Sequence, residues 1–361
     1  MNIRSIELKN FRNYENLEIS FDEGTNILFG DNAQGKTNIL EAAYMSGTTK
    51  SHKGSRDREM IRFGEEEAHL KTVVVRGGRE YQIDMHLKKN RAKGIAIDKI
   101  PIKKASELFG ILNIVFFSPE DLNIIKNGPV ERRRFLDSEL CQLDRIYLAD
   151  LTNYNKILAQ RNKLLKDMIY RPSLSDTLPV WDMQLIETGK KIIRRRKQFV
   201  DELREIVSDI HYRISGGKEE LFLKYEPNID DIFFEDELSR AKEKDKKLCQ
   251  TSVGPHRDDL LFSIGDVDIR KYGSQGQQRT SALSLKLSEI ELVRKSISDT
   301  PVLLLDDVLS ELDSSRQNYL LNNISDTQTI ITCTGLDEFV NSKFRMDKIF
   351  KIVEGTVESE D

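Results

Sequence analysis

Long apolar runs, grouped cysteines and a dominant charge are all missing from this 361-residue sequence. No segment approaches the ~20 consecutive apolar residues that a membrane-spanning helix needs, and the opening MNIRSIELKN lacks the apolar stretch of a signal peptide. The three cysteines, Cys141, Cys249 and Cys333, are far apart, and the five histidines show no metal-ligand spacing. These absences predict a cytoplasmic protein with no membrane segment and no structural metal.

The charges nearly cancel, with 56 Lys and Arg against 60 Asp and Glu and a net charge of -4. A protein with this balance has no global positive field to attract nucleic acid. Any binding of DNA must therefore depend on local basic patches.

The chain is longer than the size at which one hydrophobic core usually stops growing, so more than one domain is expected. Alternating apolar residues predict strands over residues 3–29 and a hairpin around residues 76–79. Apolar residues at helical spacing follow Gly128 and resume after Pro172, which predicts two long helices in an antiparallel hairpin.

The last part of the chain returns to a mixed pattern. It predicts a polar helix over residues 235–248, a second hairpin over 260–269, a helix over 277–294 and a buried strand over 302–305. The expected domains are residues 1–118, a helical arm over 119–250 and a return to the first lobe over 251–361.

The strongest local motif is a phosphate-binding loop, GDNAQGKT, between an apolar strand and a helix. Its backbone N–H groups and the helix start would face the phosphates of ATP. Lys36 would bridge the β- and γ-phosphates, and the Thr37 hydroxyl would be a ligand of Mg²⁺. The expected ATP-binding residues in and beside the loop are Gly30, Asp31, Asn32, Ala33, Gln34, Gly35, Lys36, Thr37 and Asn38.

The buried strand 302–305 ends in two carboxylates, which would lie beside the metal site. We expect Asp306 to hold Mg²⁺ and Asp307 to polarise the attacking water. An acidic pair that caps the following turn is the alternative reading of these two residues.

A third motif, YGSQGQQR, places Ser274 and Gly276 at the start of the predicted helix, and SELD with Asp313 follows the two carboxylates. Taken alone, Ser274 is only a helix cap. In this order, however, the motifs resemble the head of ABC-type ATPases. The resemblance implies an α/β fold with a mixed sheet, an inserted α-helical arm, and a dimer in which Ser274 and Gly276 reach the ATP of the partner; it makes Lys36, Ser274, Asp307 and Asp313 the catalytic candidates.

Two departures from the wider ABC pattern concern hydrolysis. Asp307 stands where the family usually has glutamate, and residues 331–334 read ITCT where many members carry a histidine. A shorter carboxylate and the missing histidine both indicate a slow ATPase.

The opening IELKNFRNY (6–14) resembles the N-terminal strand of SMC-type ATPase heads. Four further stretches resemble the RecF family of bacterial repair proteins: FSPEDL (117–122), RRRFLD (132–137), GPHRDD (254–259) and DDVLSELD (306–313). The resemblance implies contact of Arg12 with ATP and a role in DNA replication, repair and the SOS response. It also implies binding to duplex DNA near single-strand gaps, an ATP-dependent homodimer, and cooperation with RecR and RecO in loading RecA.

The DNA contacts themselves are open from sequence, because a charge run on a helix is often only a solvated face. The candidates are Arg132, Arg133, Arg134, Arg194, Arg195, Arg196, Lys53 and Arg56. Without interleaved aromatic residues these runs favour contacts with duplex backbone over stacking on single-strand bases. His256 and Arg257 have no neighbouring nucleophile, which favours a structural role.

Two other functions fit parts of the pattern. A transporter ATPase subunit would have a compact helical subdomain in place of a long arm. A non-enzymatic DNA scaffold would not need the intact Lys36, Asp306 and Asp307.

Overall fold

The computed structural model describes residues 1–324, 326–336 and 344–360, and the chain forms two compact units. The first comprises Met1–Asp121 and Glu289–Asp361, and the second comprises Leu122–Ser288. Nearly all of the predicted arm, 119–250, falls in the second unit. That unit continues to Ser288 because the strand that follows residue 250 pairs with a strand of the arm.

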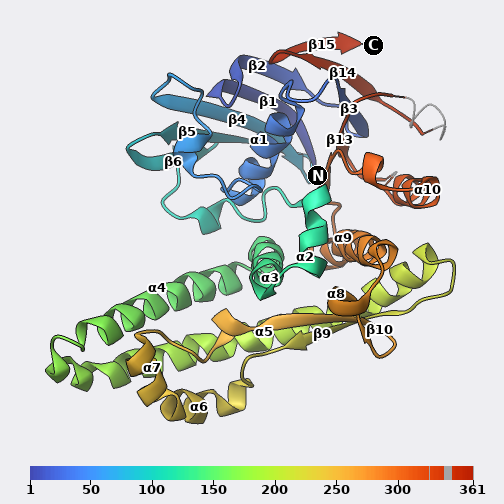
Figure 1. Cartoon of the computed structure of the whole chain (residues 1–361). Helices are drawn as coiled ribbons and strands as arrows, with labels where there is room; N and C mark the ends of the chain where they lie inside the picture. Colours follow the sequence, from blue (N-terminus) through green and yellow to red (C-terminus); the bar gives the residue numbers. More distant parts are fainter. Residues whose placement is uncertain (325, 337–343, 361) are drawn as a thin grey trace. The chain divides into compact units, whose positions relative to one another are not determined.

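The first unit contains two six-stranded sheets, one of them fully antiparallel (Figure 1). The strands of the antiparallel sheet are, in spatial order, β2 (Tyr14–Ser20), β1 (Asn2–Phe11), β4 (Glu67–Arg76), β5 (Arg79–Lys88), β6 (Arg91–Ile97) and β7 (Ile100–Pro101). Arg76 lies opposite Arg79, which confirms the predicted hairpin. Alternate side chains of β4, such as Ala68 and Leu70, are buried, whereas Glu67 and His69 face solvent.

The second sheet is parallel except for its edge strand β15. Its strands are, in spatial order, β15 (Thr356–Glu360), β14 (Lys348–Val353), β3 (Thr25–Phe29), β13 (Thr329–Cys333), β12 (Val302–Asp306) and β8 (Ile114–Phe117). The predicted strand 302–305 is β12. It pairs on both edges, and its apolar residues are fully buried, as an unbroken apolar run predicts.

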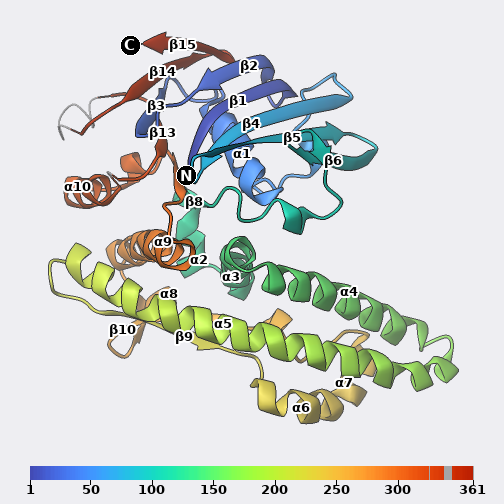
Figure 2. The ribbon, with the colours of Figure 1, turned by 180° about the vertical axis from the view of Figure 1, so that it is seen from behind.

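Helix α1 (Lys36–Thr48) packs between the two sheets (Figure 2). Its apolar residues share one buried cluster with Ile6 of β1, Leu70 of β4 and Leu304 of β12. Ser46 and Thr72 form a buried hydrogen bond of 2.6 Å that joins α1 to β4. Helix α10 (Ser314–Asn323) completes the longer elements of this unit.

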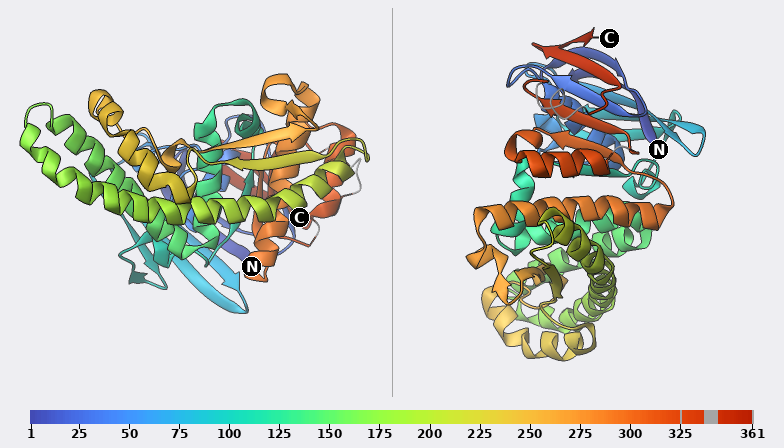
Figure 3. Two further views of the ribbon diagram at one scale, coloured as in Figure 1. Left: turned by 90° about the horizontal axis from the view of Figure 1, so that it is seen from below. Right: turned by 90° about the vertical axis from the view of Figure 1, so that its right-hand side faces the viewer.

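The second unit is mainly helical (Figure 3). Its helices are α2 (Leu122–Lys126), α3 (Pro129–Leu143), α4 (Arg145–Asp167), α5 (Leu178–Ile214), α6 (Phe234–Arg240), α7 (Lys242–Leu248) and α8 (Ile269–Tyr272). A small antiparallel sheet follows the order β11 (Val267–Asp268), β10 (Asp259–Ile264) and β9 (Leu221–Glu226). Helix α9 (Gln275–Ile297) begins in this unit and ends in the first.

The predicted helical hairpin is confirmed in α4 and α5, which lie side by side (Figures 2 and 3). The first predicted helix is interrupted at Asp144, whose carboxylate accepts hydrogen bonds from the N–H groups of Ile146 and Tyr147. This cap starts α4 as a separate helix. Among the described residues, no helix is long and apolar enough to cross a membrane.

Three buried arginines connect the helices of the second unit. Arg161 of α4 pairs with Asp182 and Asp245, each at 2.7 Å. Arg132 of α3 pairs with Asp259 at 2.5 Å. Each ion pair joins two elements that are distant in sequence, so these charges hold the unit together from inside.

The third arginine, Arg196 of α5, has the largest set of partners. It donates to Asp137 and to Asp258, each at 2.8 Å, and to the hydroxyl of Tyr147 and the carbonyl of Pro255. Its side chain is 2% exposed. The prediction that Arg132 and Arg196 contact DNA is therefore wrong, because both guanidinium groups are enclosed and already neutralised.

Replacing Arg196 should destabilise the second unit strongly. Arg196→Ala leaves Asp258 buried without its counter-charge, a change that typically costs about 3–5 kcal/mol. Arg194 lies two residues before Arg196 and is exposed in an ion pair with Asp231, so Arg194→Ala should cost less than about 1 kcal/mol. Urea unfolding followed by the fluorescence of Trp181, the single tryptophan, reports on α5 directly. Equal midpoints for the two variants would contradict the role assigned to Arg196.

Candidate nucleotide-binding site

The phosphate loop connects the end of β3 to the start of α1, as predicted. Two of its glycines are required by geometry. Gly30 has φ of +147°, and a Cβ atom there would lie 2.4 Å from the carbonyl oxygen of Ile352. Gly35 has φ of +114°, and a Cβ atom there would lie 2.5 Å from Nδ2 of Asn13. A side chain at either position would displace the loop.

The asparagine that follows Arg12 fixes the outer side of the loop. Asn13 donates from Nδ2 to the carbonyl oxygen of Gln34 at 3.0 Å, and its Oδ1 accepts from Asn38 at 2.7 Å. These contacts place Gln34 and Asn38 beside the helix start. The role of Asn13 could not be predicted, because it depends on the packing of the β1–β2 turn against the loop.

The side chain of Lys36 folds over the loop that precedes it. Its Nζ donates to the carbonyl oxygens of Gly30 at 2.5 Å and Asp31 at 2.7 Å. Burial lowers the pKa of Lys36, while the nearby Asp306 and Asp307 act in the opposite direction. The ammonium group is thus held at the helix N-terminus, where an anion is also favoured.

The two predicted metal ligands are in direct contact. The Thr37 hydroxyl donates to Oδ1 of Asp306 at 2.8 Å, although the two residues are 269 positions apart in sequence. Hydroxyl and carboxylate oxygens are the ligands that Mg²⁺ prefers. The donor set therefore fits a magnesium ion, with Thr37 and Asp306 as the protein ligands.

Asp307 directly follows β12 and has φ of +53°. Its backbone N–H donates to the hydroxyl of Thr332 at 3.0 Å, and that hydroxyl donates to Oδ1 of Asp306 at 2.8 Å. Thr332 is a site residue that sequence reasoning missed. The position of Thr332 follows from the pairing of β12 with β13, which sets Asp306 opposite Thr332.

The environment of Asp307 suits a proton acceptor. Burial and the adjacent carboxylate of Asp306 raise the pKa of Asp307. A raised pKa brings a carboxylate closer to the range in which it accepts a proton efficiently at neutral pH. The geometry thus gives Asp306 and Asp307 different environments, because Asp306 accepts hydrogen bonds from two hydroxyls and Asp307 is partly buried beside a second carboxylate.

Arg12 is held by a buried carboxylate of α1. Its guanidinium donates twice to Glu41, each at 2.7 Å, and once to the hydroxyl of Ser55. Burial raises the pKa of Glu41, but the hydrogen bonds from Arg12 and Ser51 together lower it by more. The pKa of Glu41 therefore lies below its ordinary value. Contact of Arg12 with ATP remains a prediction, and Glu41 is a third residue, after Asn13 and Thr332, that the sequence did not reveal.

The serine of the third motif starts α9 in the second unit. Its hydroxyl accepts from the N–H of Gln277 at 3.1 Å, and the Gln277 side chain accepts from the N–H of Ser274 at 2.9 Å. This reciprocal pair is a capping box. Ser274 and Gly276 are exposed, so the helix start is open to solvent. Asp313 similarly caps α10 by accepting from the N–H of Arg316.

The structure therefore brings Lys36, Thr37, Asp306 and Asp307 together in the first unit. Ser274 and Gly276 belong to the second unit. Their action on the ATP of a partner chain stays a prediction.

The remaining candidates for DNA contact differ in exposure. Arg133 donates to the carbonyl oxygen of Asp258, and Arg195 pairs with Asp144 at 3.0 Å. Arg194 is exposed and paired with an aspartate. Three further candidates are exposed and belong to none of the described ion pairs: Lys53, Arg56 and Arg134.

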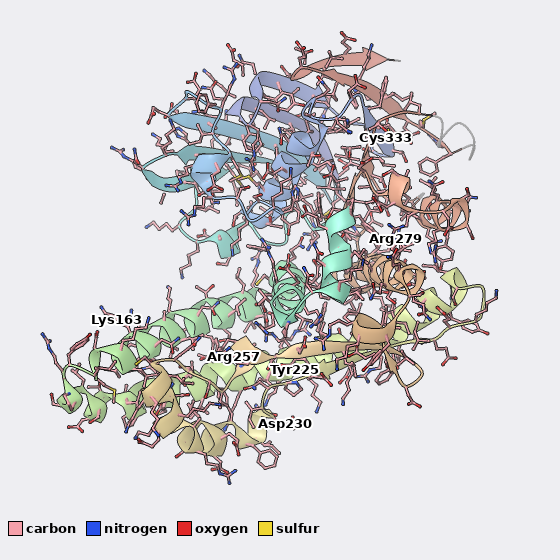
Figure 4. All side chains as sticks on the ribbon, in the orientation of Figure 1. Lys163, Tyr225, Asp230, Arg257, Arg279 and Cys333 are labelled. Atoms are coloured by element: carbon pink, nitrogen blue, oxygen red, sulfur yellow. The ribbon has the colours of Figure 1, made fainter. Side chains whose placement is uncertain are left out.

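The GPHRDD segment is structural, in agreement with the expectation for His256. Its Nε2 contacts the carbonyl oxygen of Thr251, which can only accept, so Nδ1 accepts from the Tyr154 hydroxyl at 2.7 Å. Burial lowers the pKa of His256 to about 4, consistent with this neutral form. Figure 4 shows Arg257 and Tyr225 on this part of the second unit, where the Tyr225 hydroxyl donates to Asp258.

Comparison with known proteins identifies the family of the chain. The chain matches the family model for the RecF/RecN/SMC N terminal domain over residues 2–358. It is 74% identical over 358 residues to the DNA replication and repair protein RecF of Agathobacter rectalis, covering 99% of both chains. It is 62% identical to the RecF of Lachnospira eligens over the full length of both. The chain belongs to the RecF family.

Solved structures agree with this family. The recombination mediator protein RecF–ATP of the RecFOR pathway is 36% identical, and the match covers 99% of this chain and 97% of that chain with a TM-score of 0.93. An Smc head bound to the C-terminal winged-helix domain of ScpA has a TM-score of 0.59 at 17% identity, which shows a common fold alone. The expected fold, an ABC-type ATPase head with mixed sheet and helices, is confirmed.

Lys36→Ala should abolish ATP binding in this RecF-family chain without unfolding it. The variant removes the charge aimed at the phosphates but leaves the glycines and α1 in place. Lys89→Ala, which removes a lysine in the β5–β6 turn that pairs with Glu66, is the matched control and should bind ATP normally. Calorimetric titration with ATP measures both, and an unchanged affinity for Lys36→Ala would remove the loop from the binding site.

Proposed function

We propose that this chain is an ATP-dependent DNA-binding clamp of recombinational repair and replication, in which ATP binding closes a homodimer and slow hydrolysis reopens it. The names of its relatives, DNA replication and repair protein RecF, support the general role. The solved RecF–ATP structure supports ATP as the ligand.

The observation that carries the proposal is the convergence of three segments on one point. The loop contributes Lys36 and Thr37, β12 contributes Asp306 and Asp307, and β13 contributes Thr332. A phosphate-binding loop beside two carboxylates of different environment is suited to hydrolysis of a phosphoanhydride. Bound Mg²⁺ would neutralise part of the negative charge of the phosphates.

Each proposed catalytic group has a separate task. Lys36 holds the β- and γ-phosphates, and Asp307 orients a water molecule and accepts its proton as the water attacks the γ-phosphorus. The bond from the γ-phosphorus to the bridging oxygen then breaks, which leaves ADP and phosphate. Asp307 reaches less far than a glutamate, so turnover is slow and the bound state lasts.

The open start of α9 supports a two-chain site. A helix N-terminus attracts anions because its first N–H groups and its dipole favour negative charge. Ser274 and Gly276 present such an end to solvent. In the proposed dimer, this end contacts the γ-phosphate held by Lys36 of the partner, and Asp313 lies at the same junction. Two ATP molecules are then enclosed.

Binding to DNA depends on local cations, since the net charge is -4. We propose that Lys53, Arg56 and Arg134 contact the phosphates of duplex DNA near single-strand gaps. The family resemblance adds RecR as a direct partner, with RecO and RecA acting in the same process.

The two-chain site can be tested with three variants of the full chain. Ser274→Arg should bind ATP normally and fail to dimerise, because the phosphate loop is intact but the capping helix is blocked. Asp307→Asn should dimerise with ATP and accumulate in that state, because the water is no longer deprotonated. Mixing Ser274→Arg with Lys36→Ala should restore part of the association, since one complete half-site remains. Sedimentation velocity with and without ATP measures all three.

Ser173→Arg is the control, because it adds the same charge at an exposed serine of the second unit. It should dimerise like the parent. Normal ATP-dependent dimerisation of Ser274→Arg, or a monomeric Asp307→Asn that hydrolyses ATP at the parent rate, would rule out the enclosed two-ATP site.

The DNA surface can be tested by salt dependence. The double variant Lys53→Ala/Arg56→Ala and the single variant Arg134→Ala should each weaken binding to duplex DNA for every sequence. Each lost phosphate contact should flatten the plot of log affinity against log salt by about 0.9. Arg240→Ala, an exposed arginine of α6 paired with Glu237, should leave the slope unchanged. If the slope is unchanged in every variant, these residues do not contact phosphate.

A further inference from the structure

A cluster of two histidines and a glutamate lies on the solvent face of the antiparallel sheet, outside the nucleotide site. His69 of β4 is the register partner of His86 of β5, and Glu67 lies two residues before His69 on the same face. The imidazole rings are stacked with centroids 3.9 Å apart and an angle of 24° between their planes. Strand pairing thus brings together histidines that are distant in sequence.

The donor atoms of the three side chains point toward one another. Nε2 of His86 lies 3.0 Å from Oε2 of Glu67, and Nε2 of His69 lies 3.8 Å from Oε1 of the same carboxylate. Each residue offers one ligand atom such that all three lie within 4.8 Å of one another. Bonds of about 2.0–2.1 Å to a tetrahedral metal place ligand atoms about 3.4 Å apart. The separations of the donor atoms here, from 3.0 Å to at most 4.8 Å, bracket that value, and the stacked rings would turn to direct both nitrogens at one ion.

The surroundings leave room for a metal and one further ligand. The register partner of His86 on β6 is Gly94, which contributes no side chain. The cluster borders a groove of about 700 Å³ that His69, His86 and Gly94 help to line.

We propose that Glu67, His69 and His86 form a site for a divalent transition metal of the zinc class, with the fourth position open to water or an external ligand. Two imidazoles and one carboxylate are a donor set that suits Zn²⁺ and not Mg²⁺, which prefers oxygen ligands alone. Three protein ligands with an open position are the arrangement of zinc sites that exchange a ligand.

A surface ion-pair cluster is the alternative interpretation. Lys88, the register partner of Glu67, has its Nζ 3.6 Å from the same carboxylate. In that case the histidines would serve only as weak partners of Glu67 in solvent. The two interpretations differ in what Lys88 does, because an ammonium group competes with a metal for Glu67 but supports an ion-pair cluster.

The test is titration of the EDTA-treated full chain with ZnCl₂, without nucleotide, in a calorimeter. The parent should bind one equivalent saturably. His69→Ala and His86→Ala should each weaken this binding by at least about tenfold, since even loss of a residue that only supports a ligand costs 10–100-fold. Lys88→Ala should strengthen it. Titration with CoCl₂ should produce the visible absorption of tetrahedral cobalt in the parent, and this absorption should be missing in His69→Ala and His86→Ala.

Two controls make the result specific. Glu67→Gln should weaken zinc binding as the histidine variants do. Glu66→Gln removes the same charge from the adjacent position, where Glu66 pairs with Lys89, and it should bind zinc like the parent. Asp306→Asn alters the proposed magnesium ligand and should leave the affinity for zinc unchanged. This result would separate the zinc site from the magnesium site. Circular dichroism confirms the fold of each variant. Absence of saturable binding by the parent, or zinc affinities of His69→Ala and His86→Ala equal to that of the parent, would overturn the proposal.

Discussion

Helix α1 is packed against a sheet on each side, and the nucleotide-binding loop takes its geometry from this packing. The helix start cannot shift without disturbing both sheets, because residues on opposite faces of α1 share one apolar cluster with β1, β4 and β12. The parallel sheet also places the ends of β3 and β12 at the same edge as that start. The contact of Thr37 with Asp306 therefore follows from the way the first unit is packed.

Motifs that are contiguous in sequence could be predicted, because their geometry is local. The phosphate loop, the Arg76–Arg79 hairpin, the buried strand β12 and the paired helices of the arm all follow from spacing within short windows. The interruption at Asp144 was not predicted, since helical apolar spacing continues through it. Only the capping contacts of the aspartate reveal the break.

Residues whose role depends on a distant partner could not be predicted. Thr332 and Glu41 have no local motif, and each acts through a residue far away in the chain, Asp306 and Arg12 respectively. The basic runs misled for a related reason. Adjacent arginines on a helix point in different directions, so Arg196 enters the core while Arg194 faces solvent. The sequence shows the total charge of such a run, but it does not show which arginines are neutralised by a carboxylate partner.

The enclosure of α1 also sets how the first unit can open. Amide hydrogens exchange with solvent through local unfolding where a segment has few buried contacts, and through global unfolding where it is enclosed. A helix buried between two sheets belongs to the second class. The loop is anchored to this enclosed helix, so its binding geometry should persist in any partly unfolded form that keeps the two sheets together. The unit would then lose its nucleotide site and its core in one cooperative step.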